Sequence, residues 1–489
     1  MADNENKRTD DANTTPDGSS ASAAPPAGKF TQGNTLRHVV VMTMTGSVGL
    51  MSTFLVDFAN LFYISQLGQA QLAAAIGYSG TLLFFLIAIS IGLTIAGTAL
   101  VSRAIGAGDR VRARRLGTAA LLLSITVMTA LSILTMVFVR DALGLLGASG
   151  ETLDVAIGYL LIVLPATPFM GIGMVCSGLL RAVGDARRSM YVMLLGGAVS
   201  AVMDPLLIFG LDLGVNGAAI STVMARTVVM GTGLYGAILV HDLIARPNLG
   251  IVKEHAGELF KIAGPAMMTN LATPVGNAFV TSALAVYGDA VVAGWAVIGR
   301  IIPVAFGAVF ALSGAVGPIL GQNFGAGLTD RVRSAYLNAC GFIVAYGLVV
   351  WLVLWAISGQ IVIMFDASGE GADLIIFFCK VASLGFIFNG ALFVANASFN
   401  TLGVPLMSTG FNWARATIGI VPFVWIGASL YGANGVLAGH ALGGVAFGLA
   451  AAVTGYRVIG VLSERPTGQP ALPVWQVAMS AFSSGRAWN

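Results

Sequence analysis

Charged side chains are scarce in this sequence. Asp, Glu, Lys and Arg make up 10% of the 489 residues, whereas 56% are hydrophobic. Soluble domains average about 25% charged residues, so the composition excludes an ordinary soluble globular domain. The three cysteines form an odd set inside apolar segments, which argues against a disulfide framework or a cysteine-based metal motif. The first thirty-odd residues lack an apolar core and predict a disordered tail, not a signal peptide.

Long apolar runs fill the rest of the chain. Each is long enough to cross about 30 Å of hydrocarbon, which takes about 20 helical residues. We therefore expect an all-α polytopic membrane protein with twelve transmembrane helices. The expected spans are 38–66, 72–102, 116–139, 153–179, 188–211, 215–240, 257–287, 291–320, 335–358, 372–399, 406–428 and 433–460.

The basic residues indicate how these helices are oriented. With the N-terminal tail in the cytoplasm, 20 of the 25 Lys and Arg residues fall in the tails or in the cytoplasmic connections. Four lie within spans, and Arg140 alone lies outside. The positive-inside rule therefore predicts that both termini of this multi-pass membrane protein lie in the cytoplasm.

The second half of the sequence repeats the first at a shift of about 219 residues. IGAGDRV at 105 aligns with FGAGLTD at 324, GASGE at 147 with DASGE at 366, and GVNGAA at 214 with GANGVL at 432. Each half has six spans, so the two halves should run in the same sense and form two lobes. The expected domains are a tail at 1–35, an N-lobe at 36–245, a linker at 246–256, a C-lobe at 257–460 and a cytoplasmic tail at 461–489.

Two acidic residues lie inside the apolar spans, both in the first half. Asp57 and Asp204 fall at a similar depth, and an ionised side chain there costs about 2.5–3.5 kcal/mol. Two close carboxylates in low dielectric do not both stay ionised, so one would bind a proton or a cation. We predict a cation-coupling site that also includes Tyr159, Thr222, Ser200 and Ser177. Two separate structural aspartates are the alternative.

The second half has lost both acids. At the repeat shift, Asn277 replaces the first aspartate and His440 replaces Thr222. Arg300 and Lys380 also lie within its spans, and these four residues are candidates for a substrate cavity. Arg226 and Arg415 are further cations inside the spans, and we expect a structural role for Arg226 and for His440.

Several ordered motifs resemble the multidrug and toxic compound extrusion (MATE) family over residues 35–460. They are Asp57 in the first helix, LLRAVGDARRS at 179, VMDPLLIFG at 202, and GRI followed by VGPILGQNFGAG at 299–327. The resemblance implies two six-helix lobes forming a V. It also implies a central cavity that exports organic cations and lipophilic drugs in exchange for protons or sodium.

In the branch with DNA-damage-inducible and archaeal members, the family's cation-site residues fall on Asp57, Asp204, Tyr159 and Thr222. Two asparagines of that branch fall on Ser177 and Ser200, and this departure favours protons over sodium, because sodium needs a fuller oxygen shell. A possible sodium site would use Asp57, Asp204 and Thr222. Between residues 36 and 67 the first helix has no proline, unlike many family members.

Other classes of function fit the sequence less well. GASG at 147–150 resembles a serine-protease motif, but its recurrence in DASGE at 366 indicates a turn before a helix, so we expect no enzyme. A lipid-linked oligosaccharide flippase of the same superfamily is the main alternative. A passive channel is disfavoured by a buried titrating pair. We expect a monomer in the lipid bilayer with small-molecule drugs as partners, no cofactor and no nucleic acid.

Overall fold

The computed structural model describes residues 28–65, 70–463 and 474–483, and within these ranges every regular element is helical. The first half contains α1 (Thr35–Ser65), α2 (Ala70–Gly106), α3 (Arg110–Val137), α4 (Val139–Leu145), α5 (Gly150–Val163), α6 (Thr167–Ala182), α7 (Ala186–Pro205) and α8 (Gly214–Leu234). The second half contains α9 (Leu249–Ala285), α10 (Asp289–Ala305), α11 (Gly307–Gly325), α12 (Thr329–Met364), α13 (Gly369–Lys380), α14 (Gly385–Leu402), α15 (Pro405–Ala414), α16 (Val421–Ser463) and α17 (Val474–Ser483).

Short 3-10 and π segments interrupt or extend several of these helices. η2 (Leu164–Ala166), η5 (Ala382–Leu384) and η6 (Arg415–Gly419) each join two helices, η3 (Leu206–Gly210) and η4 (Tyr235–Val240) extend α7 and α8, and η1 (Lys29–Thr31) precedes α1. Proline explains the break at η2: Pro168 has no N–H for the carbonyl of Leu164, which instead accepts a hydrogen bond of 2.5 Å from Ser132 Oγ. The two tails predicted at 1–35 and 461–489 fall largely outside the described residues.

Twelve spans can be traced in the described part of the chain. Length and hydropathy identify nine helices there, or ten when α10 and α11, bent by 48°, count as one span. The segment Pro405–Leu462 holds two antiparallel spans, because the backbone leaves the helical region at Tyr431 and Gly432 inside α16. The remaining span is α9, which packs against α2 and α15. The sequence prediction of twelve helices is confirmed.

The internal repeat is visible in the backbone. Eight of the eleven described glycines with positive φ form four pairs about 219 residues apart, at or just before the start of a helical span, and similar φ values recur within each pair. These pairs are Gly108 and Gly327, Gly150 and Gly369, Gly184 and Gly403, and Gly214 and Gly432. Ser149 and Ser368 occupy the positions before α5 and α13, but neither side chain forms the capping hydrogen bond expected from the sequence.

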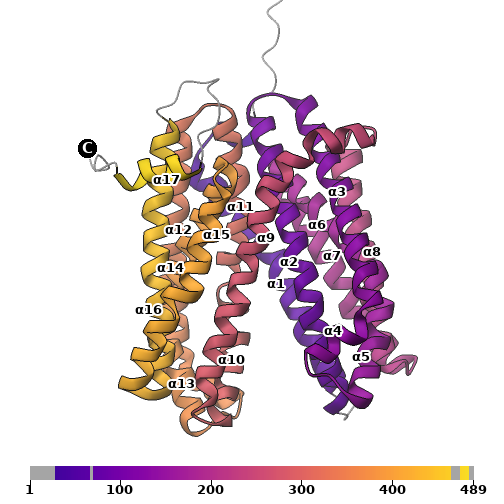
Figure 1. The fold of residues 1–489 in the computed structure, drawn as a ribbon, viewed down its shortest axis with the longest axis vertical. Coiled ribbons are helices and arrows are strands. Elements are labelled where there is room, and N and C mark those ends of the chain that lie inside the picture. Colours follow the sequence, from indigo (N-terminus) through magenta and orange to yellow (C-terminus); the bar gives the residue numbers. More distant parts are fainter. Residues whose placement is uncertain (1–27, 66–69, 464–473, 484–489) are drawn as a thin grey trace, which may run out of the picture.

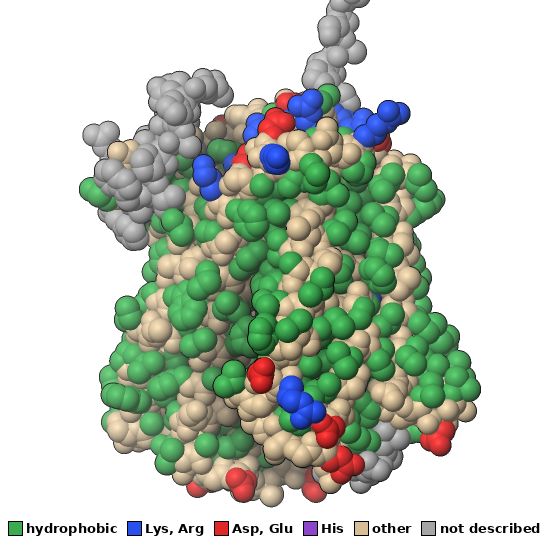
Figure 2. Space-filling view, turned by 45° about the vertical axis from the view of Figure 1, so that its right-hand side comes forward, with side chains coloured by type: hydrophobic (Ala, Val, Ile, Leu, Met, Phe, Trp, Pro, Cys, Tyr) green, Lys and Arg blue, Asp and Glu red, His purple; other side chains and the backbone are tan. Residues whose placement is uncertain are grey.

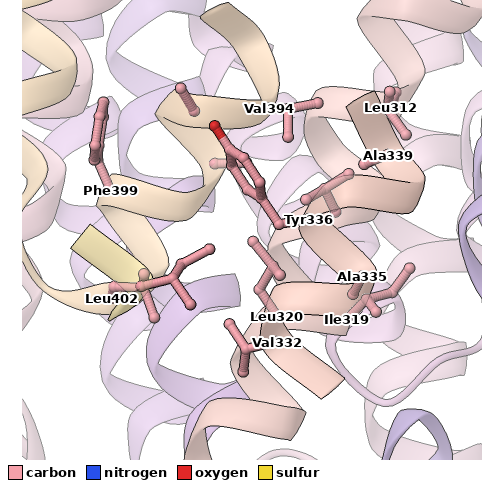
Figure 3. Packing of buried hydrophobic residues seen from close by; sticks show 14 of the residues in the cluster. Leu312, Ile319, Leu320, Val332, Ala335, Tyr336, Ala339, Val394, Phe399 and Leu402 are labelled. Carbon is pink, nitrogen blue, oxygen red and sulfur yellow. The ribbon is translucent and has the colours of Figure 1, made fainter. Parts of the chain in front are cut away.

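The helices form two lobes, one from α1–α8 and one from α9–α16 (Figure 1). Lys and Arg side chains gather at the end of the molecule where α1 begins and α2 ends, which we call the basic end, and apolar side chains cover the middle (Figure 2). The C-lobe core packs around Tyr336 of α12, which is 1% exposed and donates a hydrogen bond of 2.7 Å to the carbonyl of Ala452 (Figure 3). An apolar belt between polar ends is the surface expected of a protein embedded in a bilayer.

The lobes meet most closely where α2 and α11 cross near the basic end. A Cβ placed on Gly106 would lie 2.0 Å from the carbonyl oxygen of Gln322, and one on Gly325 would lie 2.0 Å from that of Arg103. Gly106 and Gly325 are repeat equivalents, as are Arg103 and Gln322, so the two contacts are near copies of each other. Only glycine permits this approach of two helix backbones.

A segment before α1 lies across this contact. Phe30 of η1 is 1% exposed, and its backbone N–H donates to Gln322 Oε1 at 2.8 Å. Lys29 Nζ donates to the carbonyl of Gly184 in the N-lobe at 2.8 Å, while Arg331 of the C-lobe donates to the carbonyl of Phe30 at 3.0 Å. The chain around Phe30 therefore ties the two lobes together at the basic end.

The crossing gives a first prediction. Gly325→Val should place a side chain against the Arg103 carbonyl and lower stability by about 1–3 kcal/mol, the usual cost of overpacking. Gly341→Val in α12 is the matched control, because open space surrounds that glycine. Thermal unfolding of the purified variants measures the effect, and equal Tm values for the two would contradict the tight crossing.

Candidate functional site

Asp204 is the most deeply buried acid in the described residues. It is the second-to-last residue of α7, two positions before the π segment η3 begins, and the residue is 1% exposed. Neither carboxylate oxygen has a partner within hydrogen-bonding distance among the described residues, although the Ser221 hydroxyl of α8 lies near enough to act on the carboxylate. A buried carboxylate without a donor is stabilised by taking up a proton or a cation.

Three other predicted site residues lie in the same part of the N-lobe. Ser200 is one helical turn before Asp204 and is 9% exposed. Tyr159 of α5 is 7% exposed and lies in an apolar cluster with Ile208 and Ala218. Thr222 of α8 follows Ser221 and donates its hydroxyl to the Ala218 carbonyl at 2.9 Å. These residues thus lie in the part of the N-lobe around the end of α7.

The side chain of Asp57 lies outside what the structure describes, but its backbone position in α1 is clear. A Cβ on Gly197 of α7 would lie 3.4 Å from both Ser52 and Val56 of α1. Asp57 follows Val56 directly, so it is level with the residues just after Gly197. Asp204 is then about 8 Å further along the parallel helix α7. The two acids therefore occupy similar depths on neighbouring helices.

Ser177 is not part of this group. Its hydroxyl forms a hydrogen bond of 2.8 Å with Ser189, and Arg181 Nη1 donates to it at 2.9 Å. Ser189 precedes Asp204 by fifteen residues of α7, or about 22 Å along the helix. The sequence placed Ser177 deeper in its span than Tyr159, but it could not show that the partner of Ser177 lies near the basic end.

Arg226 has the structural role that the sequence suggested. It is 9% exposed on α8, and its Nη1 donates to the Val163 carbonyl at 3.1 Å and to Thr167 Oγ1 at 3.3 Å. Both acceptors flank η2, where the helix from α5 to α6 is interrupted. Arg226 therefore supplies a donor to one backbone carbonyl and one side-chain hydroxyl beside the proline-containing break.

The polar residues of the C-lobe are only partly connected. Trp295 packs edge-on against His440, with ring centroids 6.0 Å apart, and its Nε1 donates to Thr281 Oγ1 at 2.9 Å. Thr281 in turn donates to the Asn277 carbonyl at 2.9 Å. Trp295 thus lies between His440 and Thr281, but no hydrogen bond or ring contact among the described residues joins the side chains of His440 and Asn277.

Arg300 and Lys380 point elsewhere. The guanidinium of Arg300 lies 5.7 Å from the ring centroid of Phe58 on α1, so this exposed cation reaches the other lobe. Lys380 is exposed at the end of α13. The sequence grouped both with His440 and Asn277 in one substrate cavity. Among the described residues, His440 alone of the four lines the small cavity found inside the C-lobe.

Asp185, from the LLRAVGDARRS motif, lies at the basic end and caps α7. Burial opposes its ionisation, but hydrogen bonds from His241 at 2.8 Å and from the Arg188 backbone and side chain outweigh that effect and lower its pKa to about 2. Asp185 therefore stays ionised at neutral pH. Its hydrogen bond with His241 joins the start of α7 to the residue that follows η4. The motif has a structural role that spacing alone could not reveal.

No group of three or more His, Cys, Asp or Glu residues in the described ranges is arranged to hold a metal ion. Among the described side chains, the N-lobe therefore offers one buried carboxylate, that of Asp204, with hydroxyl groups nearby. The carboxylate of Asp57, whose side chain lies outside what the structure describes, is the second acid of the predicted site. Such a site can exchange a proton or a monovalent cation.

Comparison with known proteins agrees with the fold. The MatE family model matches twice, at residues 47–206 and 265–426, one match in each half of the repeat. A protein named FAD transporter from Shewanella oneidensis is 28% identical over 408 residues, covering 82% of this chain and 90% of that protein. Multidrug export protein MepA from Staphylococcus haemolyticus is 25% identical over 415 residues, covering 83% and 90%.

Solved structures show the same architecture. The Vibrio cholerae MATE transporter VcmN in its bent form superimposes with a TM-score of 0.82 at 25% identity, covering 88% of this chain and 98% of that one. An outward-facing multidrug resistance MATE transporter superimposes with a TM-score of 0.84 at 22% identity, covering 90% and 99%, which shows the shared fold. The chain is therefore a multi-pass membrane transporter, not an enzyme, and it belongs to the MatE (MATE) family.

Proposed function

We propose that this protein is a multidrug efflux antiporter of the bacterial inner membrane, with both termini in the cytoplasm. It exports organic cations and lipophilic drugs and works as a monomer. The family membership and the relatives named multidrug export protein support the direction and the substrate class. The asymmetric distribution of Lys and Arg supports the orientation, with the basic end in the cytoplasm.

The burial of Asp204 without a hydrogen-bond donor is the single observation that supports the coupling proposal. Its carboxylate is buried without a donor, and ionising it at this depth costs energy that one proton or cation would relieve. The pair of Asp57 and Asp204 therefore alternates between a charged and a neutralised state. Tyr159, Thr222 and Ser200 surround that site.

We favour protons as the coupling ion over sodium. A proton needs one carboxylate, whereas sodium needs a shell of several oxygens. In the described residues, the polar side chains named around Asp204 are the hydroxyls of Ser200, Ser221 and Thr222, which form a smaller oxygen shell than one with amide carbonyls. Sodium remains the alternative ion, held by Asp57, Asp204 and Thr222.

The transport cycle follows from the two lobes. With the basic end closed at the crossing of α2 and α11, a site between the lobes is open only away from the cytoplasm. Binding of the ion to the N-lobe acids changes the packing of α1 against α7 and reduces affinity for a cationic drug, which leaves outwards. The coupling equals the difference in drug affinity between the two states.

Two other substrates remain candidates. Flavin export is favoured by the relative named FAD transporter, which has a higher identity to this chain than the MepA relative reported above. A flippase for lipid-linked oligosaccharides is favoured by the four cations inside the spans, Arg226, Arg300, Lys380 and Arg415. Of these cations, Arg226 binds backbone and hydroxyl groups within the N-lobe, which weakens the flippase argument.

Efflux from proteoliposomes tests the substrate and the ion together. We expect a fluorescent organic cation to leave when a pH gradient is imposed without sodium, and not when a sodium gradient is imposed at constant pH. Efflux driven by sodium alone would overturn the proton assignment. Efflux of FAD from liposomes loaded with FAD in parallel tests flavin export. If FAD leaves and the organic cation does not, flavin export replaces multidrug export as the proposed function.

Neutralising the acids tests the site. Asp204→Asn and Asp57→Asn should each reduce gradient-driven efflux to the level of empty liposomes. Tm should not fall for Asp204→Asn, because an amide is cheaper to bury than a carboxylate. Asp154→Asn is the matched control, since that acid is exposed and forms a surface ion pair with Arg140. Gradient-driven efflux by Asp57→Asn would remove the coupling role from that residue.

A further inference from the structure

The centre of the C-lobe contains a cation without a counter-ion. Arg415 of η6 is 7% exposed and follows the start of α15 at Pro405 by ten residues, or about 15 Å, which is near the middle of a bilayer. Its Nη1 donates to Asn389 Oδ1 and its Nη2 to Thr273 Oγ1, each at 3.3 Å. Both acceptors are neutral, and no acidic side chain in the described residues forms an ion pair with Arg415.

Other polar groups around Arg415 are also unpaired. The Nε of Arg415 and the Nδ1 of His440 are both buried without a partner in the described part of the chain. Arg415 lies close enough to His440 to act on it electrostatically. Since Asn389 presents its oxygen to Arg415, its amide Nδ2 remains a donor, and an imidazole carries at least one N–H. Side chains from η6, α14 and α16 thus each bring an N–H group to this part of the C-lobe.

A small cavity lies within this region. Asn389, His440 and Trp295 line it together with apolar residues, and its volume is about 20 Å³. That is room for one water-sized or chloride-sized occupant, and too little for a phosphate group or a drug. A water molecule would satisfy donors, but it would leave the charge of Arg415 uncompensated in a low-dielectric environment.

We propose that the C-lobe binds one small monovalent anion, chloride in solution, in the cavity lined by Asn389 and His440. Asn389 Nδ2 and a ring N–H of His440 donate to the anion. Arg415 is not among the residues that line the cavity, but it is hydrogen-bonded to Asn389, and the anion balances the charge of its guanidinium. The anion joins η6, α14 and α16 and thereby stabilises the C-lobe. This site is independent of the acids in the N-lobe and holds the opposite charge.

Thermal unfolding of the purified protein tests the site. Replacing sodium gluconate by sodium chloride at equal ionic strength should raise the Tm by about 3 °C once chloride reaches ten times its dissociation constant. Arg415→Gln should abolish this chloride-dependent shift. Arg140→Gln, which changes an exposed arginine, should keep it. A shift that persists undiminished in Arg415→Gln would overturn the proposal.

A second measurement uses the unaltered protein, in case Arg415→Gln does not fold. Crystals grown in sodium bromide should give an anomalous scattering peak in the cavity beside Arg415, Asn389 and His440. The absence of any peak there, or a peak elsewhere with an empty or water-filled cavity, would contradict anion binding at this site.

Discussion

The close crossing of α2 and α11 is the contact on which the arrangement of the two lobes depends. Gly106 of α2 lies against the backbone carbonyl of Gln322, and Gly325 of α11 lies against that of Arg103. Helix association in a bilayer gains little from the hydrophobic effect and depends on packing and hydrogen bonds. The same region therefore also collects the bridge through Phe30, where backbone and side-chain hydrogen bonds add to the packing. Opening towards the basic end requires all of these contacts to separate together.

The interior polar groups of the two lobes have opposite signs, although the lobes share a fold. The N-lobe buries Asp204 without a donor, and the C-lobe buries Arg415 without an acid. The N-lobe also buries a cation, Arg226, but the guanidinium of Arg226 donates hydrogen bonds to groups beside the helix break at η2. Duplication thus supplied two copies of one scaffold, and the buried polar side chains of the two copies have diverged.

Much of the architecture could be predicted from the residues. Apolar runs of sufficient length predicted twelve helices, and the glycines of IGAG and FGAG marked the repeat whose members cross at the lobe contact. Depth along each span also grouped Tyr159, Thr222 and Ser200 with Asp204, because rise per residue is nearly constant in a helix. Ser177 was misplaced, since depth within one span says nothing about the face it presents or its neighbour, Ser189.

The sequence by itself determined the membrane class, the helices, the duplication and the presence of two acids within the spans, since these depend on local composition and on the length needed to cross a bilayer. The tertiary structure alone decided which buried groups have partners. Among the described residues, Asp204 has no hydrogen-bond partner and Arg415 has no acidic partner, whereas Arg226 and Asp185 are satisfied, and this follows from which helices pack together. Pairing joins residues far apart in the chain, so no local pattern encodes it.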